Sequence, residues 1–142
     1  METLLHLTEA AVPTNVRRIR HRVAEAASEA GASSPVAEEV ALCVGEAVAN
    51  AARHAYEHVE GEVTVLVQAD GDLLVVVRDQ GRGLGEPHPV KSGGFGLRII
   101  KALSREVSIS SLPSRGTEVR MRFPLEADEP RRRSDAMGQR AA

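Results

Sequence analysis

The spacing of apolar residues divides the chain into helical and extended segments. Between residues 13 and 31, apolar side chains such as Ile19 and Val23 recur three or four positions apart, which predicts an amphipathic helix. Pro13 suits the start of this helix and Gly31 its end. The outward positions carry an unusually basic set of side chains: Arg17, Arg18, Arg20, His21 and Arg22.

A second apolar-periodic segment predicts a helix over residues 34–56, with Ser34 as its N-cap and Pro35 at its first position. One side of this helix is apolar and is expected to face the core; it consists of Val40, Val44, Ala47, Val48, Ala51 and Ala55. The other side is polar and consists of Glu46, Asn50, Arg53 and His54.

From residue 62 the period of the pattern changes to two, which predicts strands. Residues 62–68 alternate, Asp70-Gly71 is a hairpin signal, and residues 73–79 are apolar on both faces, so that this strand is expected at the centre of a sheet. Further patterns predict a short edge strand at 3–7, a helix at 95–103 and strands at 105–111 and 117–125. Grouped helices and hairpin strands favour an α+β fold, a two-layer α/β sandwich with a mainly antiparallel sheet.

Composition limits the classes of protein that fit this pattern. A chain of 142 residues suits one domain, expected over residues 1–126, and residues 127–142 lose apolar content and read as a disordered tail. The net charge of −2 argues against direct nucleic-acid binding. Cys43 is the only cysteine and is expected to be a buried, reduced thiol. We find no signal peptide and no apolar stretch long enough for the membrane, so we expect a cytoplasmic protein.

Three polar features carry the candidate chemistry. Glu46 and Asn50 stand one helical turn apart, and an acid and an amide in that relation can hold a hydrated divalent cation and accept a proton. A solvated polar face is an equally good account of this pair by itself. Asp79-Gln80-Gly81-Arg82-Gly83 follows the central strand; it is either a simple turn or an acid placed to bind a flat ligand beside glycines.

The third feature is the cluster Gly93-Gly94-Phe95-Gly96-Leu97, which leads into the expected helix. Backbone N–H groups at such a start can bind phosphate, although a flexible hinge would have the same composition. Considered together, the three features would suit a nucleotide with its magnesium ion. Magnesium takes oxygen ligands and keeps several waters beside phosphates, so Asn50 could suffice as its protein ligand.

In their order and spacing, these motifs resemble those of the GHKL (Bergerat-fold) ATPases, and among them the small anti-sigma-factor serine/threonine kinases of bacterial stress and sporulation switches. The resemblance covers about residues 10–125. It is carried by Glu46-Ala-Val-Ala-Asn50-Ala-Ala-Arg-His54-Ala-Tyr56, Asp79-Gln-Gly81-Arg-Gly83, Gly94-Phe-Gly96-Leu97 and Gly116-Thr117.

The resemblance implies roles for these residues. Asn50 would coordinate Mg²⁺ at the ATP phosphates, Glu46 would be the general base, and Asp79, assisted by Thr117, would accept a hydrogen bond from the adenine amino group. The other nucleotide-binding residues that we expect are Arg53, Gly81, Gly83, Lys91, Gly93, Gly94, Phe95, Gly96 and Leu97.

The expected activity is transfer of the ATP γ-phosphate to a serine or threonine of a STAS-domain anti-anti-sigma protein, together with binding of a sigma factor. Arg17 and Arg20 are the expected partner-binding residues, although an ordinary exposed face explains them as well. The resemblance also implies a homodimer. The alternative is a regulatory module that binds nucleotide and partner without kinase activity. The catalytic domain of a histidine kinase is disfavoured, because no helix pair with a phospho-accepting histidine precedes the domain in this chain.

Overall fold

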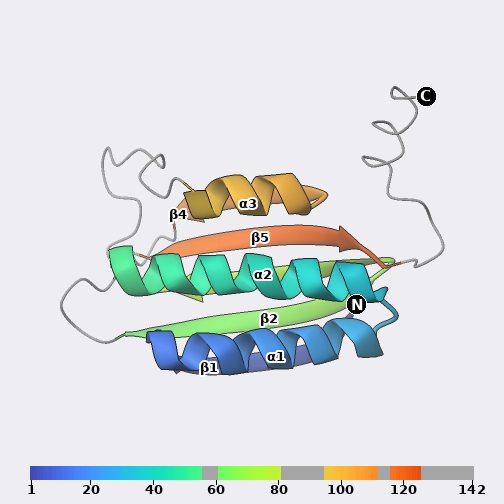
Figure 1. Cartoon of the computed structure of the whole chain (residues 1–142), viewed down its shortest axis with the longest axis horizontal. Coiled ribbons are helices and arrows are strands. Elements are labelled where there is room, and N and C mark those ends of the chain that lie inside the picture. The colour runs from blue at the N-terminus through green and yellow to red at the C-terminus, as the bar shows by residue number, and fades with distance from the viewer. Residues whose placement is uncertain (56–60, 81–94, 112–115, 126–142) are drawn as a thin grey trace.

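The computed structural model describes residues 1–55, 61–80, 95–111 and 116–125. In this part of the chain, helices cover one face of a single five-stranded sheet (Figure 1), so the predicted two-layer α+β sandwich is confirmed. The elements are β1 (Glu2–Ala10), α1 (Pro13–Glu29), α2 (Ser34–Asn50), η1 (Ala51–Ala55), β2 (Glu62–Asp70), β3 (Asp72–Asp79), α3 (Phe95–Leu103), β4 (Glu106–Ser111) and β5 (Thr117–Pro124).

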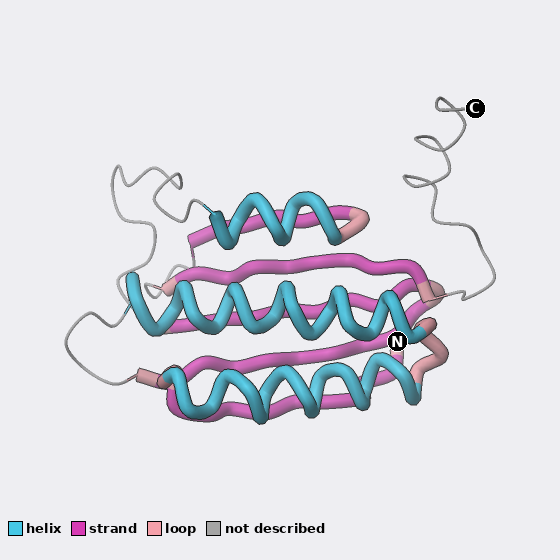
Figure 2. The backbone as a smooth tube through the Cα atoms, viewed as in Figure 1, coloured by secondary structure: helices cyan, strands magenta, loops and turns pink. Residues whose placement is uncertain are grey.

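The sheet has the strand order β1-β2-β3-β5-β4, and every neighbouring pair is antiparallel. β3 is therefore central, as its apolar character on both faces predicted. β2 and β3 form the predicted hairpin, whose turn is at Gly71 with a φ of 79°. Two elements, α3 and β4, lie between β3 and β5 in the chain, yet β5 pairs with β3 and β4 lies at the edge beyond it (Figure 2).

The core lies between the sheet and the helices and is built mainly from small aliphatic side chains. Alternate residues of β2 and β3 face the helices, and Val63, Val65, Val75 and Val77 are buried there. The apolar sides predicted for the first two helices are confirmed by buried Ile19, Val23, Ala26, Ala27, Val40, Val44, Ala47, Val48 and Ala51. Cys43 is fully buried, as expected.

Two details of the second helix correct the sequence-based expectation. Its N-cap is Ser33 rather than Ser34, because the Ser33 hydroxyl oxygen accepts a hydrogen bond from the Val36 N–H at 3.3 Å. The helix also does not stay α-helical to residue 56: the α geometry ends at Asn50, and a π-helical turn, η1, follows. Residue periodicity could not show this change, since π-helical turns are local insertions in an otherwise regular pattern.

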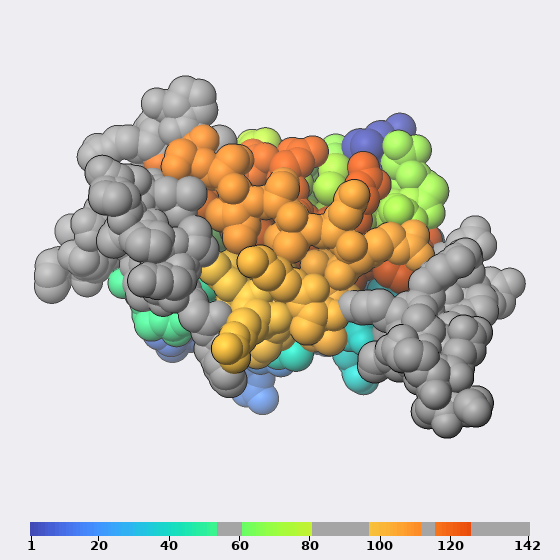
Figure 3. Space-filling view, turned by 90° about the horizontal axis from the view of Figure 1, so that it is seen from above, coloured from blue at the N-terminus to red at the C-terminus, as the bar shows by residue number. Residues whose placement is uncertain are grey.

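On the sheet face opposite the helices, β3 and β5 carry ionic side chains, and no helix or strand among the described residues covers this face. Glu118 accepts hydrogen bonds from Arg78 Nε at 2.8 Å and from Arg120 Nη1 at 3.1 Å. Burial alone would raise the pKa of Glu118, but these two arginines outweigh it and lower the pKa below its ordinary value. Figure 3 views the molecule from the side of α3 and β4, whose residues form most of the described surface there.

Candidate nucleotide-binding site

The end of α2 presents two of the predicted residues one turn apart. Glu46 and Asn50 are both half-buried on this helix, while its apolar side is packed on the core. Burial raises the pKa of the Cys43 thiol to about 12, and the negative charges of Glu39 and Glu46 on the same helix add to this shift. Carboxylate and amide oxygens are the donors that Mg²⁺ prefers, so this pair fits a magnesium site.

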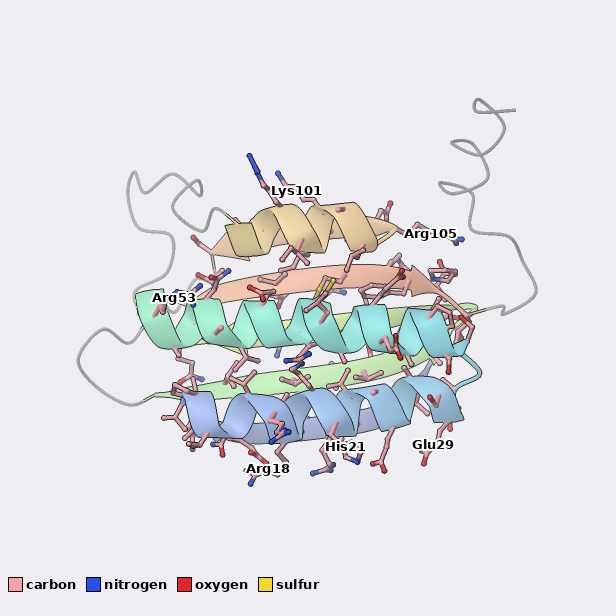
Figure 4. All side chains as sticks on the ribbon, in the orientation of Figure 1. Arg18, His21, Glu29, Arg53, Lys101 and Arg105 are labelled. Carbon is pink, nitrogen blue, oxygen red and sulfur yellow. The ribbon has the colours of Figure 1, made fainter. Side chains whose placement is uncertain are left out.

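Arg53 is the next predicted residue, and it lies within η1 (Figure 4). Its guanidinium Nη2 donates a hydrogen bond to Asn50 Oδ1 at 2.8 Å. Asn50 and Arg53 were both expected to contact the nucleotide or its metal, and the structure shows that they also contact each other. Sequence analysis placed them on one side of the helix but did not predict this bond.

Asp79 ends β3 on the face that packs against the helices. It follows Val75 and Val77 at the spacing of two that keeps side chains on the same face of a strand, and it is 8% exposed. In the sheet it is directly opposite Thr117, the first residue of β5. The two residues expected to recognise adenine therefore lie side by side at one end of the sheet.

Gly116 is required by this pairing. A Cβ atom on residue 116 would lie 2.2 Å from the Asp79 carbonyl oxygen and 3.0 Å from the Gln80 Cα. The φ of Gly116 is +120°, which other residues rarely adopt. Only glycine thus lets the start of β5 approach the end of β3 this closely.

The elements that carry these residues come together at one end of the sandwich. The last turn of α2, the end of β3, and the starts of α3 and β5 lie at the same end of the molecule, on the left in Figure 1. α2 packs against α3, β3 and β5, so the layers are in direct contact. The element that carries Glu46 and Asn50 and the strands that carry Asp79 and Thr117 therefore meet at one end of the sandwich, with the start of α3 at the same end.

The structure describes only part of the glycine-rich motifs. Gly81, Gly83, Lys91, Gly93 and Gly94 lie outside the described residues. Phe95 and Gly96 are the first two residues of α3, and Leu97 is half-buried against the core in its first turn. The expected helix after the glycine cluster is therefore confirmed, while the contacts of the cluster itself stay predictions.

The basic side of α1 is exposed, as the sequence indicated, and includes Arg17 and Arg20. Arg18 belongs to this side too, but it pairs with Glu9 of β1. The stem of Arg20 lies against Gly45 of α2, where a Cβ would be 2.7 Å from the Arg20 Cδ. Sequence analysis missed this contact; the signal that could have revealed it is a glycine in the middle of a helix, where it costs stability unless it makes room for a neighbour.

The model of the histidine kinase-like ATPase domain family matches residues 10–123. This match covers more than half of the chain, and the fold and the order of the motifs agree with it, so the chain belongs to this family of ATPase domains. The residues that it covers include α1, α2 and the sheet from β2 to β5, with all the predicted site residues. Among the described residues, no helix is long and apolar enough to cross a membrane.

Relatives with assigned names are found within this family. The anti-sigma F factor of Bacillus subtilis is 28% identical in an alignment of length 134 that covers 85% of this chain and 92% of that protein. The serine-protein kinase RsbW of Bacillus licheniformis is 32% identical in an alignment of length 122 that covers 74% of this chain and 76% of that protein. Among solved structures, the RsbU and RsbW domains of a Mycobacterium tuberculosis protein match with a TM-score of 0.64 and 26% identity, over 85% of this chain and 32% of that one.

Proposed function

We propose that this protein is an anti-sigma-factor serine/threonine kinase. It binds ATP with Mg²⁺, transfers the γ-phosphate to a serine or threonine of a STAS-domain anti-anti-sigma protein, and holds a sigma factor, acting as a homodimer in the bacterial cytoplasm. The observation that carries the proposal is that the C-terminal part of α2, which bears Glu46 and Asn50, and the Asp79–Thr117 pair lie at the same end of the sandwich. The names of the relatives support the same assignment.

The polar residues at that end of the sandwich would bind and orient ATP. Asp79 is buried and faces the helix layer, which suits a carboxylate that accepts a hydrogen bond from the adenine amino group, with Thr117 opposite as a second polar group. Asn50 would hold the metal through its amide oxygen. Bound Mg²⁺ would neutralise charge on the phosphates, which is the main requirement of phosphoryl transfer.

We assign Glu46 to the proton transfer of the reaction. The hydroxyl oxygen of the substrate side chain forms a bond to the γ-phosphorus, the bond from that phosphorus to the β,γ-bridging oxygen breaks, and ADP leaves. The Glu46 carboxylate takes the hydroxyl proton. Such a positioned base contributes about 10²- to 10⁴-fold to the rate.

Partner recognition is assigned to the exposed basic side of α1. Arginine forks pair with carboxylates in a bidentate way, so Arg17 and Arg20 suit acidic groups on a protein partner. The packing of Arg20 on Gly45 supports this role, because it limits the side chain to one region of the surface before a partner arrives.

The test is phosphate transfer from labelled ATP to STAS-domain proteins of the same organism. We expect the wild-type protein to label one of them on serine or threonine. Glu46→Gln should lower the rate by about 10²-fold or more while nucleotide binding persists. Glu38→Gln is the matched control, since it makes the same change on an exposed residue of the same helix. Undiminished transfer by the Glu46 variant would remove this residue as the base.

A second function, a regulatory module without kinase activity, predicts a different result. Such a module would bind ATP and retain a sigma factor, but it would label none of the STAS proteins. Co-purification of the protein with its partners, with and without ATP, separates this outcome from the kinase. Absence of both nucleotide binding and partner retention would contradict both functions.

A further inference from the structure

The hydrogen bond between Arg53 and Asn50 occupies the atom that the proposed metal needs. Arg53 Nη2 donates to Asn50 Oδ1 at 2.8 Å, a bond strengthened by the charge of the guanidinium. Oδ1 is the only oxygen of this side chain, and the Nδ2 group is a donor that cannot coordinate a cation. Any metal held by Asn50 must therefore bind the oxygen that Arg53 contacts.

A guanidinium and Mg²⁺ do not share one amide oxygen well. Mg²⁺ would lie about 2.1 Å from Oδ1 and demands near-ideal octahedral geometry. With Arg53 still bonded to the same oxygen, like charges would lie within a few ångströms of each other, where their repulsion is strong. Because Oδ1 has two lone pairs, the conflict is electrostatic rather than steric, and it disfavours simultaneous binding of the arginine and the metal.

The backbone around Asn50 and Arg53 suits an arginine that can leave the asparagine. The α-helical geometry of α2 ends at Asn50, and Arg53 is the middle residue of the π-helical turn η1 that follows (Figure 4). π-helical turns are rare in proteins overall, but those that do occur are often found at functional sites. Arg53 is also exposed, so its side chain has room to leave Asn50 without disturbing the core.

From these observations we propose that Arg53 and Mg²⁺ compete for Oδ1 of Asn50, and that binding of the metal with its nucleotide releases the arginine. The inference rests on the proposed function, because it takes Asn50 as the metal ligand. In this proposal Arg53 is a positioning residue, and it sets the Mg²⁺ concentration at which the site is half-saturated. A residue that only contacted phosphate would affect nucleotide affinity instead.

The experiment measures the Mg²⁺ dependence of nucleotide binding with a fluorescent ATP analogue. For wild-type protein and for Arg53→Gln, binding of the analogue is followed while Mg²⁺ is titrated. We expect the half-saturating Mg²⁺ concentration to fall about tenfold in Arg53→Gln, since a hydrogen bond to a charged group no longer has to be broken. Arg53→Lys retains the charge but lacks the forked guanidinium, so its half-saturating Mg²⁺ concentration should lie between those of the wild type and Arg53→Gln.

Two controls make the result specific. Arg22→Gln removes the same charge from an exposed position on α1 and should leave the half-saturating Mg²⁺ unchanged. Asn50→Ala should abolish the Mg²⁺ dependence of binding, and Arg53→Gln in that background should have no further effect. Circular dichroism of each variant confirms that it is folded.

The outcomes separate this inference from the function on which it rests. A half-saturating Mg²⁺ concentration that is unchanged or higher in Arg53→Gln overturns the competition, and a rise would mean that Arg53 orients Asn50 for the metal. If the wild-type protein does not bind the analogue at any Mg²⁺ concentration, the proposed function itself is wrong. Mg²⁺-dependent binding that Asn50→Ala leaves intact would remove Asn50 as the ligand and the inference with it.

Discussion

Gly116 packs against the backbone of Asp79 so closely that a Cβ atom on residue 116 would lie 2.2 Å from the Asp79 carbonyl oxygen. The contact joins the end of β3 to the start of β5 next to the Asp79–Thr117 pair. It therefore determines where the buried carboxylate lies at the end of the sheet. A glycine directly beside the proposed adenine-binding acid thus lets the ends of the two strands approach each other.

Gly116→Ala should be strongly destabilising and should weaken nucleotide binding. It combines an unfavourable φ of +120° with a steric clash against backbone, and we expect the free energy of unfolding to fall by about 2–4 kcal/mol. Gly71→Ala is the control: its φ is +79°, but nothing lies within 4 Å of the added Cβ, so about 1–2 kcal/mol is expected. Urea denaturation and ATP titration measure both effects. Equal destabilisation by the two variants would contradict the close approach.

Gly45→Ala should displace Arg20 without removing its charge. The added Cβ would lie 2.7 Å from the Arg20 Cδ, and the end of a flexible side chain can move away. The higher helix propensity of alanine, about 1 kcal/mol, should offset lost packing, so that stability changes little. We expect Gly45→Ala to reproduce, in weaker form, the loss of partner binding caused by Arg20→Ala. Partner affinity that falls only in Arg20→Ala would show that the position of the charge is unimportant.

Glu118→Gln should reduce stability in a pH-dependent way. The pKa of Glu118 is lower in the folded protein than its ordinary value of 4.5, so its contribution is present above that value and is lost as the pH falls through the folded pKa. At neutral pH we expect the free energy of unfolding of the variant to be lower by about 1–2 kcal/mol. The difference from wild type should shrink below pH 4.5, as followed by urea denaturation across the acid range. A constant difference would contradict the lowered pKa.

Cys43 should be almost unreactive in the folded protein. Burial, with Glu39 and Glu46 nearby, raises the pKa of its thiol from 9.0 to about 12, so at pH 8 the thiolate fraction is about a thousandfold smaller than for an ordinary cysteine. Alkylation by iodoacetamide, read by mass spectrometry, should be suppressed in the native protein and rapid in urea. Fast labelling of the native protein would mean that the core around α2 opens readily.

Much of the fold could be predicted because the spacing of apolar residues differs between helices and strands. The strands and helices lie within a few residues of their expected bounds, the exceptions being a longer β1 and the π-helical end of the second helix. The central place of β3 followed from its apolar character on both faces, since such a strand must be covered on both sides. The order of the motifs predicted Glu46, Asn50 and Asp79 as parts of one site, and the elements that carry them lie at one end of the sandwich.

Specific contacts between individual residues were decided only by the three-dimensional structure. By itself the sequence determined which faces are apolar, where the chain turns, and which polar residues accompany which element. Tertiary structure decided that Gly116 touches Asp79, that Arg20 crosses Gly45, and that Arg53 is bonded to Asn50. The physical reason is that periodicity records which side of an element is buried, whereas such contacts depend on how helices pack on the sheet and on the exact backbone path.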